Sequence, residues 1–558
     1  MSTLPHRTLL GVTLCGLTVL VAVPLLAIVL QAVFPDLALG SFGRPLAHLG
    51  LTLSDPAIVT LIGNTLRLGL AVVVASALLG VPLGVLRGLF DLPLARLWDL
   101  LFLVPFMIPP YIAAMGWILL LQPAGFLQQL SGRHQGDVLF SFTGVVLVMA
   151  LNLFPAVYFA VSRAVAASGS RLGDVAQIFG ASAWRAFVRV TLPLALPALA
   201  ASLLLVFAAA IEEYGTPAVL ASNVGFFVLV TGIEQRFSSW PIDLPGAAVL
   251  SVMLMALALL AYIAQRWLTA GRDYETQTGK PVARGPRPLG RWQAPVLLLF
   301  GLVAALATMA PLFAIGATAF TATLSGGLAW DNLSLRHFHA LFAQGSAALA
   351  ALSTSFALAA GASLLTGLFG ALLAYTVLRV PSRASVALDA LSVLPNAMPG
   401  IVVAVGLILA WNQPWLPVTP YGSWPILLLA YACLLLPYPV RYAHAALRQI
   451  GRNLEASAFV HGAGFGATLR RIVLPLLAPS MTAAMLLVFA IASRELVASL
   501  LLTPTGMQTV SLFIWRQFDQ GSVGQGMAMS LIAIAATCAL VVLAHGLHGR
   551  ARRDAAVA

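Results

Sequence analysis

The sequence has few charged residues and few cysteines, and both shortages exclude classes of protein. Only 9% of the 558 residues are charged, 60% are hydrophobic, and the mean hydropathy is +0.96. An average soluble domain is about one quarter charged, so an ordinary water-soluble fold is excluded. The three cysteines, Cys15, Cys433 and Cys538, lie far apart in apolar segments without metal-ligand or redox spacing, so we expect small buried hydrophobic residues.

The formal net charge of +12 does not indicate a nucleic-acid partner. The basic residues lie in short loops between apolar runs, whereas nucleic-acid binding requires them to cluster on one face with interleaved aromatic residues. Several apolar runs are long enough, at about 20 residues, to cross a bilayer as helices. We therefore expect most of the chain to lie within a lipid bilayer.

Apolar windows predict twelve membrane spans. They lie near residues 8–33, 61–88, 97–121, 139–162, 194–213, 245–265, 293–319, 350–378, 388–411, 424–440, 476–501 and 524–547. The first run exceeds the apolar core of a signal peptide, so we expect an uncleaved span. If both termini are cytoplasmic, almost all basic residues face inward, as the positive-inside rule requires. The outer loops then hold only Arg44, Arg133, Arg236, Arg336 and Arg516.

A polar stretch rich in glycine and proline divides the chain into two halves of similar size. It lacks helical periodicity and is typical of a linker between domains. We predict segments as follows: first span and outer loop at 1–56, transmembrane domain 1 at 57–268, cytoplasmic linker at 269–292, seventh span and outer loop at 293–348, transmembrane domain 2 at 349–547, and a cytoplasmic basic tail at 548–558.

The two halves repeat. A shift of 290 residues places Pro105 and Pro109 on Pro395 and Pro399, and a shift of 282 superposes Leu192-Pro193 on Leu474-Pro475. Six spans separate the members of each pair, so both members have the same orientation. The sequence thus predicts an all-α membrane protein with about 12 transmembrane helices in two parallel six-helix repeats. The paired prolines interrupt the third and ninth spans, either as packing kinks or as a discontinuity in a pathway wall.

Two polar loops carry the most specific motif. One contains Asp174-Val175-Ala176, then Gly180, and ends at Leu192-Pro193; the other contains Glu455-Ala456-Ser457-Ala458, then Gly462, and ends at Leu474-Pro475. This pattern resembles the EAA loop of bacterial ATP-binding-cassette (ABC) importer permeases. The acidic position of that motif is Asp174 in the first loop, but it is Ala456 in the second, where Glu455 comes one residue earlier. An amphipathic helix lying on the membrane surface is the alternative.

The resemblance implies a type I ABC importer permease fold in the bacterial inner membrane. Its expected partners are two copies of a cytoplasmic ABC ATPase and a periplasmic substrate-binding protein. A phosphate-binding loop requires a lysine between glycine and serine or threonine, but Lys280, the single lysine, precedes Pro281. We therefore predict a transport subunit without catalytic residues, metal site or bound cofactor, whose partner ATPase uses ATP and Mg.

Two further segments are similar to those of ferric-iron permeases. One starts with Glu212-Glu213-Tyr214-Gly215, and the other with Arg494-Glu495-Leu496. The resemblance implies ferric iron uptake, with permeases for 2-aminoethylphosphonate, thiamine or polyamines and an ion-gradient-driven transporter as alternatives.

Charges at membrane depth usually face a cavity or a partner, and carboxylates favour hard cations. Alternatively, Glu212 or Glu495 pairs with Arg494. The predicted pathway residues are Glu212, Glu213, Arg494, Glu495, Pro105, Pro109, Pro395 and Pro399.

Overall fold

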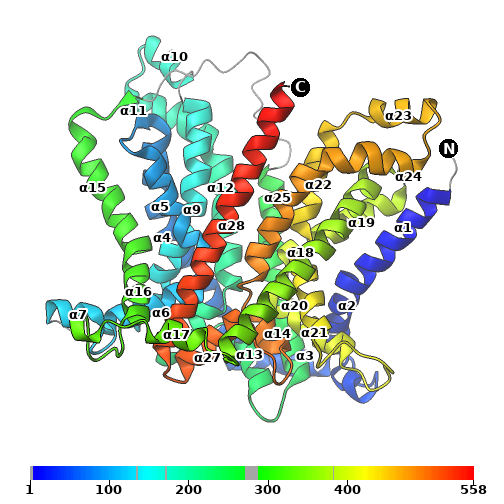
Figure 1. Ribbon diagram of the computed structural model, residues 1–558, viewed down its shortest axis with the longest axis horizontal. Helices are drawn as coiled ribbons and strands as arrows, with labels where there is room; N and C mark the ends of the chain where they lie inside the picture. The colour runs from blue at the N-terminus through cyan, green and yellow to red at the C-terminus, as the bar shows by residue number, and fades with distance from the viewer. Residues whose placement is uncertain (1–3, 133–135, 170–171, 270–286, 381, 558) are drawn as a thin grey trace. The chain divides into compact units, whose positions relative to one another are not determined.

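The structure is a computed structural model, and it describes all residues except 1–3, 133–135, 170–171, 270–286, 381 and 558 (Figure 1). Most of the predicted linker at 269–292 therefore lies outside the described residues. Among the described residues, ten helices are long and apolar enough to cross a membrane, or up to twelve when each of two bent helix pairs counts as one span. The prediction of an all-α membrane protein is confirmed.

The helices of the first half follow one another closely. They are α1 (Leu4–Leu17), η1 (Thr18–Ala22), α2 (Val23–Val33), η2 (Pro35–Leu39), α3 (Ala47–Ser54), α4 (Pro56–Leu89), α5 (Ala95–Met107), α6 (Pro110–Leu121), α7 (Phe126–Ser131), α8 (Gly136–Leu139), α9 (Phe142–Gly169), α10 (Leu172–Ile178), α11 (Ala183–Ala186), η3 (Phe187–Thr191), α12 (Leu192–Glu212), η4 (Pro217–Ala221), η5 (Ser222–Val224), α13 (Leu229–Ser238) and α14 (Leu244–Thr269).

The second half runs through a similar series. Its helices are η6 (Gly290–Trp292), α15 (Gln293–Ala304), η7 (Ala305–Met309), α16 (Ala310–Phe320), η8 (Trp330–Asn332), α17 (Arg336–Leu341), α18 (Ala347–Arg379), α19 (Arg383–Val393), η9 (Leu394–Ala397), α20 (Gly400–Trp411), α21 (Trp424–Leu435), α22 (Pro437–Gln449), α23 (Arg452–Val460), α24 (Phe465–Thr468), η10 (Leu469–Val473), α25 (Leu474–Ala492), α26 (Val497–Leu502), α27 (Val510–Asp519) and α28 (Val523–Val557). A parallel strand pair, β1 (Phe90–Asp91) and β2 (Arg287–Pro288), joins two segments distant in sequence.

Widened helical turns accompany the repeated prolines. The π-helical turns η3 and η10 lie 282 residues apart, and each directly precedes a helix whose second residue is proline, Pro193 or Pro475. A proline ring clashes with the carbonyl group four residues earlier, and a wider turn relieves that clash. The turns η1 and η7 stand in the same way before Pro24 and Pro311. The Leu-Pro signature thus coincides with a local change of helix geometry.

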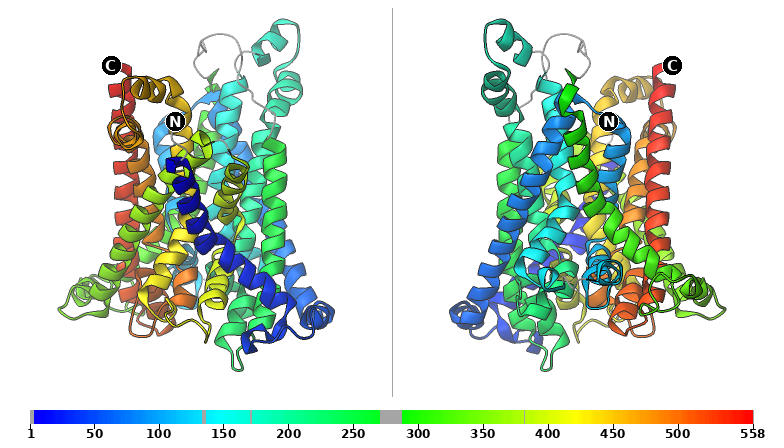
Figure 2. Two further views of the ribbon diagram at one scale, coloured as in Figure 1. Left: turned by 90° about the vertical axis from the view of Figure 1, so that its right-hand side faces the viewer. Right: turned by 90° about the vertical axis from the view of Figure 1, so that its left-hand side faces the viewer.

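The first span of each half belongs to the repeat of the other half. The chain forms two compact units: one comprises residues 1–53, 233–255 and 335–558, and the other comprises 54–232 and 256–334. In the former, α1 packs on α18 and α19, and α2 packs on α20; in the latter, α16 packs on α6 and η7 on α5. Figure 2 shows blue α1 and α2 lying across helices of the second repeat, and green α15 and α16 beside those of the first.

The first span of each half, here called the exchanged span, packs closely against a glycine in the repeat of the other half. A Cβ atom added to Gly406 of α20 would lie 2.8 Å from the carbonyl oxygen of Pro24, and one added to Gly116 of α6 would lie 2.9 Å from that of Pro311. Only glycine permits backbones to approach this closely. Both exchanged spans contain the pattern Pro-Leu-x-Ala-Ile, at 24–28 and 311–315, a repeat signal that the shifts of 290 and 282 do not reveal.

Contacts along the seventh span also fix it to the first repeat. Thr308 donates a hydrogen bond from Oγ1 to the carbonyl oxygen of Leu101 at 2.7 Å. The ring of Phe300 stacks on that of Phe102 with centroids 5.5 Å apart. Buried Leu289, directly after β2, belongs to the same hydrophobic cluster. The end of the linker, the strand pair and the seventh span therefore form one anchored segment.

The prediction that all three cysteines are buried was wrong for two of them. Cys433 is buried, Cys15 is exposed, and Cys538 is intermediate. An apolar segment that crosses a membrane is apolar on its lipid-facing side as well. The sequence around a cysteine therefore does not tell whether its side chain faces lipid or protein.

We expect Gly406→Val to lower the thermal unfolding midpoint of the detergent-solubilised protein. The added side chain must displace the backbone at Pro24, and overpacking of this kind costs about 1–3 kcal/mol. Gly316→Val is the matched control, because nothing lies within 4 Å of the position of its added Cβ. Equal midpoints for the two variants would contradict the assigned packing of the first span.

Candidate coupling loops and translocation pathway

The first motif loop is a short helix that ends at a glycine. Gly180, after α10, has φ +90°, a left-handed conformation that L side chains rarely adopt. Its N–H donates to the carbonyl oxygen of Gln177 at 3.0 Å, and the N–H of Ala181 donates to that of Ala176 at 2.9 Å. This pair of bonds satisfies carbonyl groups at the end of the helix, as in a Schellman motif.

The second motif loop repeats this geometry at the level of single hydrogen bonds. Gly462, after α23, has φ +80°. Its N–H donates to the carbonyl oxygen of Phe459 at 3.0 Å, and the N–H of Ala463 donates to that of Ala458 at 2.9 Å. Each loop then continues through a one-turn helix, α11 or α24, into the widened turn before its Leu-Pro pair. The two glycines thus end the short helices of both loops in the same way.

Apolar side chains are uncovered on both loops. In the first loop Ile178 is 79% and Phe179 is 85% exposed, and Val175 and Trp184 are also exposed; in the second, Val460 is 85% exposed and Leu454 is exposed. Among the other predicted residues, Ala456 and Ser457 are exposed, Ala176 and Ala458 are half-buried, and the side chain of Asp174 lies outside the described residues. Exposed apolar clusters of this kind are typical of surfaces that bind another protein.

Glu455 differs from the rest of its loop because its side chain points into the protein. It is 7% exposed, and its Oε1 lies 2.7 Å from Nε of Arg379. The hydroxyl of Tyr375 donates to Oε2 at 2.9 Å. The acidic residue of the second motif loop is therefore bound to α18.

The repeated prolines lie at breaks in both predicted spans. In the first half, Pro105 lies inside α5, and Pro109 caps α6 after a break at Ile108. The buried side chain of Asn152 donates from Nδ2 to the carbonyl oxygen of Pro105 at 2.9 Å, which satisfies a group near the break.

In the second half, Pro395 lies in η9 and Pro399 caps α20. The chain bends by 115° between the helical segments Arg383–Ala397 and Gly400–Trp411, which is more than a simple kink.

The predicted carboxylates lie close to these breaks. Oε1 of Glu495 lies 3.7 Å from the Cβ position of Gly400, the first residue of α20. In the other unit, a Cβ atom added to Gly215 would meet Cβ of Tyr111 near the start of α6 and would lie 3.1 Å from Oε1 of Glu213. Each unit therefore brings together a carboxylate segment and the helix that starts after a proline break, which the sequence motifs alone could not establish.

Hydrogen bonds give two of the carboxylates a local structural role. Oε1 of Glu495 accepts from the N–H groups of Val497 and Ala498 at 3.1 and 3.3 Å, at the start of α26. Oε1 of Glu213 accepts from the N–H of Thr216 at 3.1 Å. Oε1 of Glu212, at the end of α12, is buried and has no hydrogen-bond partner among the described residues. In the described part of the chain, no three His, Cys, Asp or Glu side chains are grouped to hold a metal ion.

Residues 80–273 and 363–554 each match the family described as binding-protein-dependent transport system inner membrane component. The chain belongs to this family. The two matched segments confirm the predicted resemblance to importer permeases and show two copies of the family's domain. They identify a multi-pass inner-membrane transport component rather than an enzyme.

Named relatives include permeases for different cargoes. The permease is 27% identical to the ferric transport system permease protein FbpB of Actinobacillus pleuropneumoniae over 89% of this chain and 72% of the relative. It is also 27% identical to the putative ferric transport system permease protein FbpB 1 of Haemophilus influenzae, over 83% of this chain and 73% of the relative. Identity to the putative 2-aminoethylphosphonate transport system permease protein PhnV of Salmonella typhimurium is 28% over 39% of this chain and 80% of the relative.

The side chains that hold Glu455, those of Arg379 and Tyr375, are not among the site residues that the sequence predicts. Their spacing of four residues on a long helix places both on one face, which is the signal available in the sequence. Their partner lies 76 residues away from Arg379 in the chain, so only the folded structure identifies it.

We expect Glu495→Gln to retain the thermal stability of the permease, because the amide oxygen still accepts from the first N–H groups of α26. Glu495→Leu removes that acceptor, and loss of a helix cap costs about 1 kcal/mol. Differential scanning fluorimetry of both variants in one detergent measures the difference. A midpoint for Glu495→Leu equal to that of the glutamine variant would rule out the capping role.

Proposed function

We propose that this ABC importer permease takes up ferric iron and binds two copies of a cytoplasmic ATPase through its two motif loops. The observation that carries the coupling role is the duplicated helix end at Gly180 and Gly462, with apolar side chains exposed beside each glycine. A short helix with a fixed end and an uncovered apolar side suits insertion into a cleft of another protein. Because there are two such loops, two ATPase copies would bind, one to each loop.

The remaining partners follow from the same assignment. A periplasmic binding protein delivers the cargo, and the ATPase copies use ATP and Mg, so the permease itself holds no cofactor. Both termini lie in the cytoplasm, an orientation that the concentration of arginines in the corresponding loops supports. In the compact unit that comprises residues 1–53, 233–255 and 335–558, the chain ends lie at the same end of the helices as α23 and α24 (Figure 1). This placement agrees with loops that reach a cytoplasmic ATPase.

Ferric iron is the cargo that the relatives favour. Similarity to the ferric permeases extends over most of this chain, whereas similarity to the 2-aminoethylphosphonate permease covers 39% of it. The carboxylates of Glu213 and Glu495, each beside the start of a helix after a proline break, would present oxygen atoms to a passing hard cation. 2-Aminoethylphosphonate is the second candidate, because a permease named for it matches one half of the chain.

We expect Gly462→Val to reduce binding of the ATPase about tenfold. A left-handed conformation costs an L residue roughly 1–2 kcal/mol, and a β-branched side chain is especially unfavourable there, so the helix end must change. Co-purification with the ATPase measures binding. Gly466→Val in α24 is the matched control, since Gly466 has no positive φ and nothing within 4 Å of its Cβ position. Retained binding by Gly462→Val would oppose the docking role.

The cargo and the pathway are tested together by uptake into proteoliposomes that contain permease, ATPase and binding protein. The wild type should take up ferric iron, and the double variant Glu213→Gln, Glu495→Gln should take up much less while still binding the ATPase. Glutamine keeps the capping oxygen and removes the charge, so folding is preserved. Unchanged uptake in the single and double variants would exclude the pathway role, and uptake of 2-aminoethylphosphonate instead of iron would overturn the cargo.

A further inference from the structure

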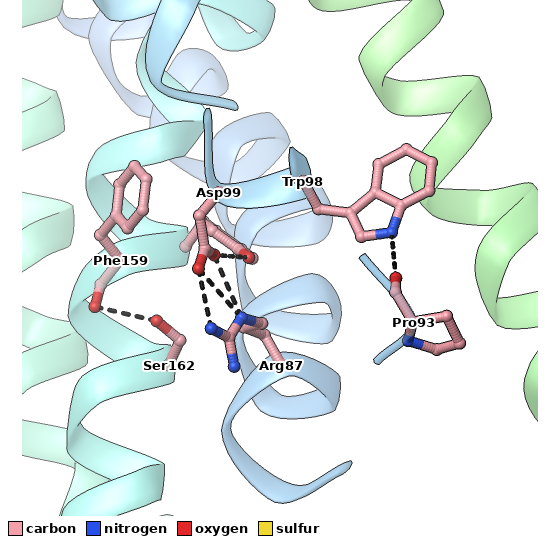
Figure 3. Close-up of polar contacts among 7 residues, drawn as sticks. Arg87, Pro93, Trp98, Asp99, Phe159 and Ser162 are labelled. Carbon is pink, nitrogen blue, oxygen red and sulfur yellow. Dashed lines mark hydrogen bonds and ion pairs between the residues drawn. The ribbon is translucent and has the colours of Figure 1, made fainter. Parts of the chain in front are cut away.

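Each half contains an arginine, a tyrosine and a carboxylate at the end of its longest span. In the first half, Arg87 of α4 binds Asp99 of α5 with Nε 3.1 and 3.2 Å from the two carboxylate oxygens and a terminal guanidinium nitrogen 2.8 Å from Oδ2 (Figure 3). The hydroxyl of Tyr158 of α9 donates to Oδ1 of Asp99 at 2.6 Å. This first triad joins three membrane helices, α4, α5 and α9.

The second triad uses the same chemistry but reaches the motif loop. Arg379 and Tyr375 both lie on α18, whereas Glu455 lies on α23, the helix of the second loop. The side chains of Arg379 and Glu455 are 10% and 9% exposed, while those of Arg87 and Asp99 are both 30% exposed. The ion pair at the second loop is therefore the more deeply buried of the two.

Further contacts make this triad a junction of four helices. A terminal nitrogen of Arg379 donates to the carbonyl oxygens of Leu447 and Ile450, at 3.2 and 2.9 Å, at the end of α22. The ring of Tyr375 meets that of Phe465 of α24 edge to face, with centroids 6.0 Å apart. One turn of α18 thus holds both short helices of the second loop, α23 through Glu455 and α24 through Phe465.

We propose that Arg379, Tyr375 and Glu455 form a rigid joint that transmits movement of the second loop directly to α18 and α22 during transport. This inference rests on the proposed coupling function, in which the three residues act as positioning residues for the second loop. Moving the loop away from α18 would leave the buried charges of Arg379 and Glu455 desolvated and unpaired, which is costly. The loop and α18 therefore move as one body. In the first half the carboxylate of the triad is Asp99 of α5, which lies outside the motif loop.

The test compares Glu455→Gln with Asp99→Asn in proteoliposomes that contain the ATPase and the binding protein. Each variant removes one carboxylate charge from an arginine-tyrosine triad, so both should lower the thermal midpoint. Only Glu455→Gln should lower the amount of ferric iron transported per ATP hydrolysed, on the order of tenfold, while the ATPase still co-purifies. Glu455→Asp, which keeps the charge, should restore part of that ratio.

Other outcomes separate the joint from the function on which it rests. The proposed joint is wrong if Glu455→Gln transports as much ferric iron per ATP hydrolysed as the wild type. It is also wrong if Asp99→Asn lowers that ratio by the same factor. If Glu455→Gln does not fold, Tyr375→Phe replaces it, because that variant keeps the ion pair and removes only the hydroxyl bond; an unchanged ratio would again overturn the joint. Failure of the wild-type permease to bind the ATPase would instead overturn the proposed function before any variant is compared.

Discussion

A backbone amide that enters the hydrocarbon core of a membrane has no water to bond, so it must find its partner within the protein. Nearly every feature of this permease follows from that constraint. The spans are helical because a helix satisfies its own amides. Where proline removes a donor, the chain forms a widened turn, as at η3 and η10, or recruits a side chain, as Asn152 does at the carbonyl of Pro105.

The same constraint gives the two repeats their exchanged first spans. With lipid as apolar as the helix surfaces, close backbone packing rather than burial of apolar area holds one span on another. Gly116 and Gly406 provide that packing at equivalent places, against Pro311 and Pro24. Each compact unit therefore combines segments from both halves of the sequence, and neither half of the chain corresponds to one complete unit.

Duplication preserved the backbone of the motif loops more strictly than their side chains. Gly180 and Gly462 share one conformation and one hydrogen-bond pattern, since only that geometry ends the short helix in the required direction. The side chains at the acidic position of the motif differ: Asp174 in the first loop stands opposite Ala456 in the second, where Glu455 comes one residue earlier and is bound to Arg379. The second loop is thereby attached to α18 through a buried ion pair.

The sequence by itself determined the membrane class, the number of spans to within two, the twofold repeat and the position of both loops. These properties depend on hydropathy, periodicity and spacing along the chain, which are local. Only the tertiary structure decided which repeat each first span joins, that Cys15 faces outward, and that Glu455 is bound to Arg379 rather than exposed. Each of these depends on contacts between residues far apart in the chain or on the face that a helix turns to its neighbours. Hydropathy does not specify those contacts, because the lipid-facing and protein-facing sides of a membrane helix are both apolar.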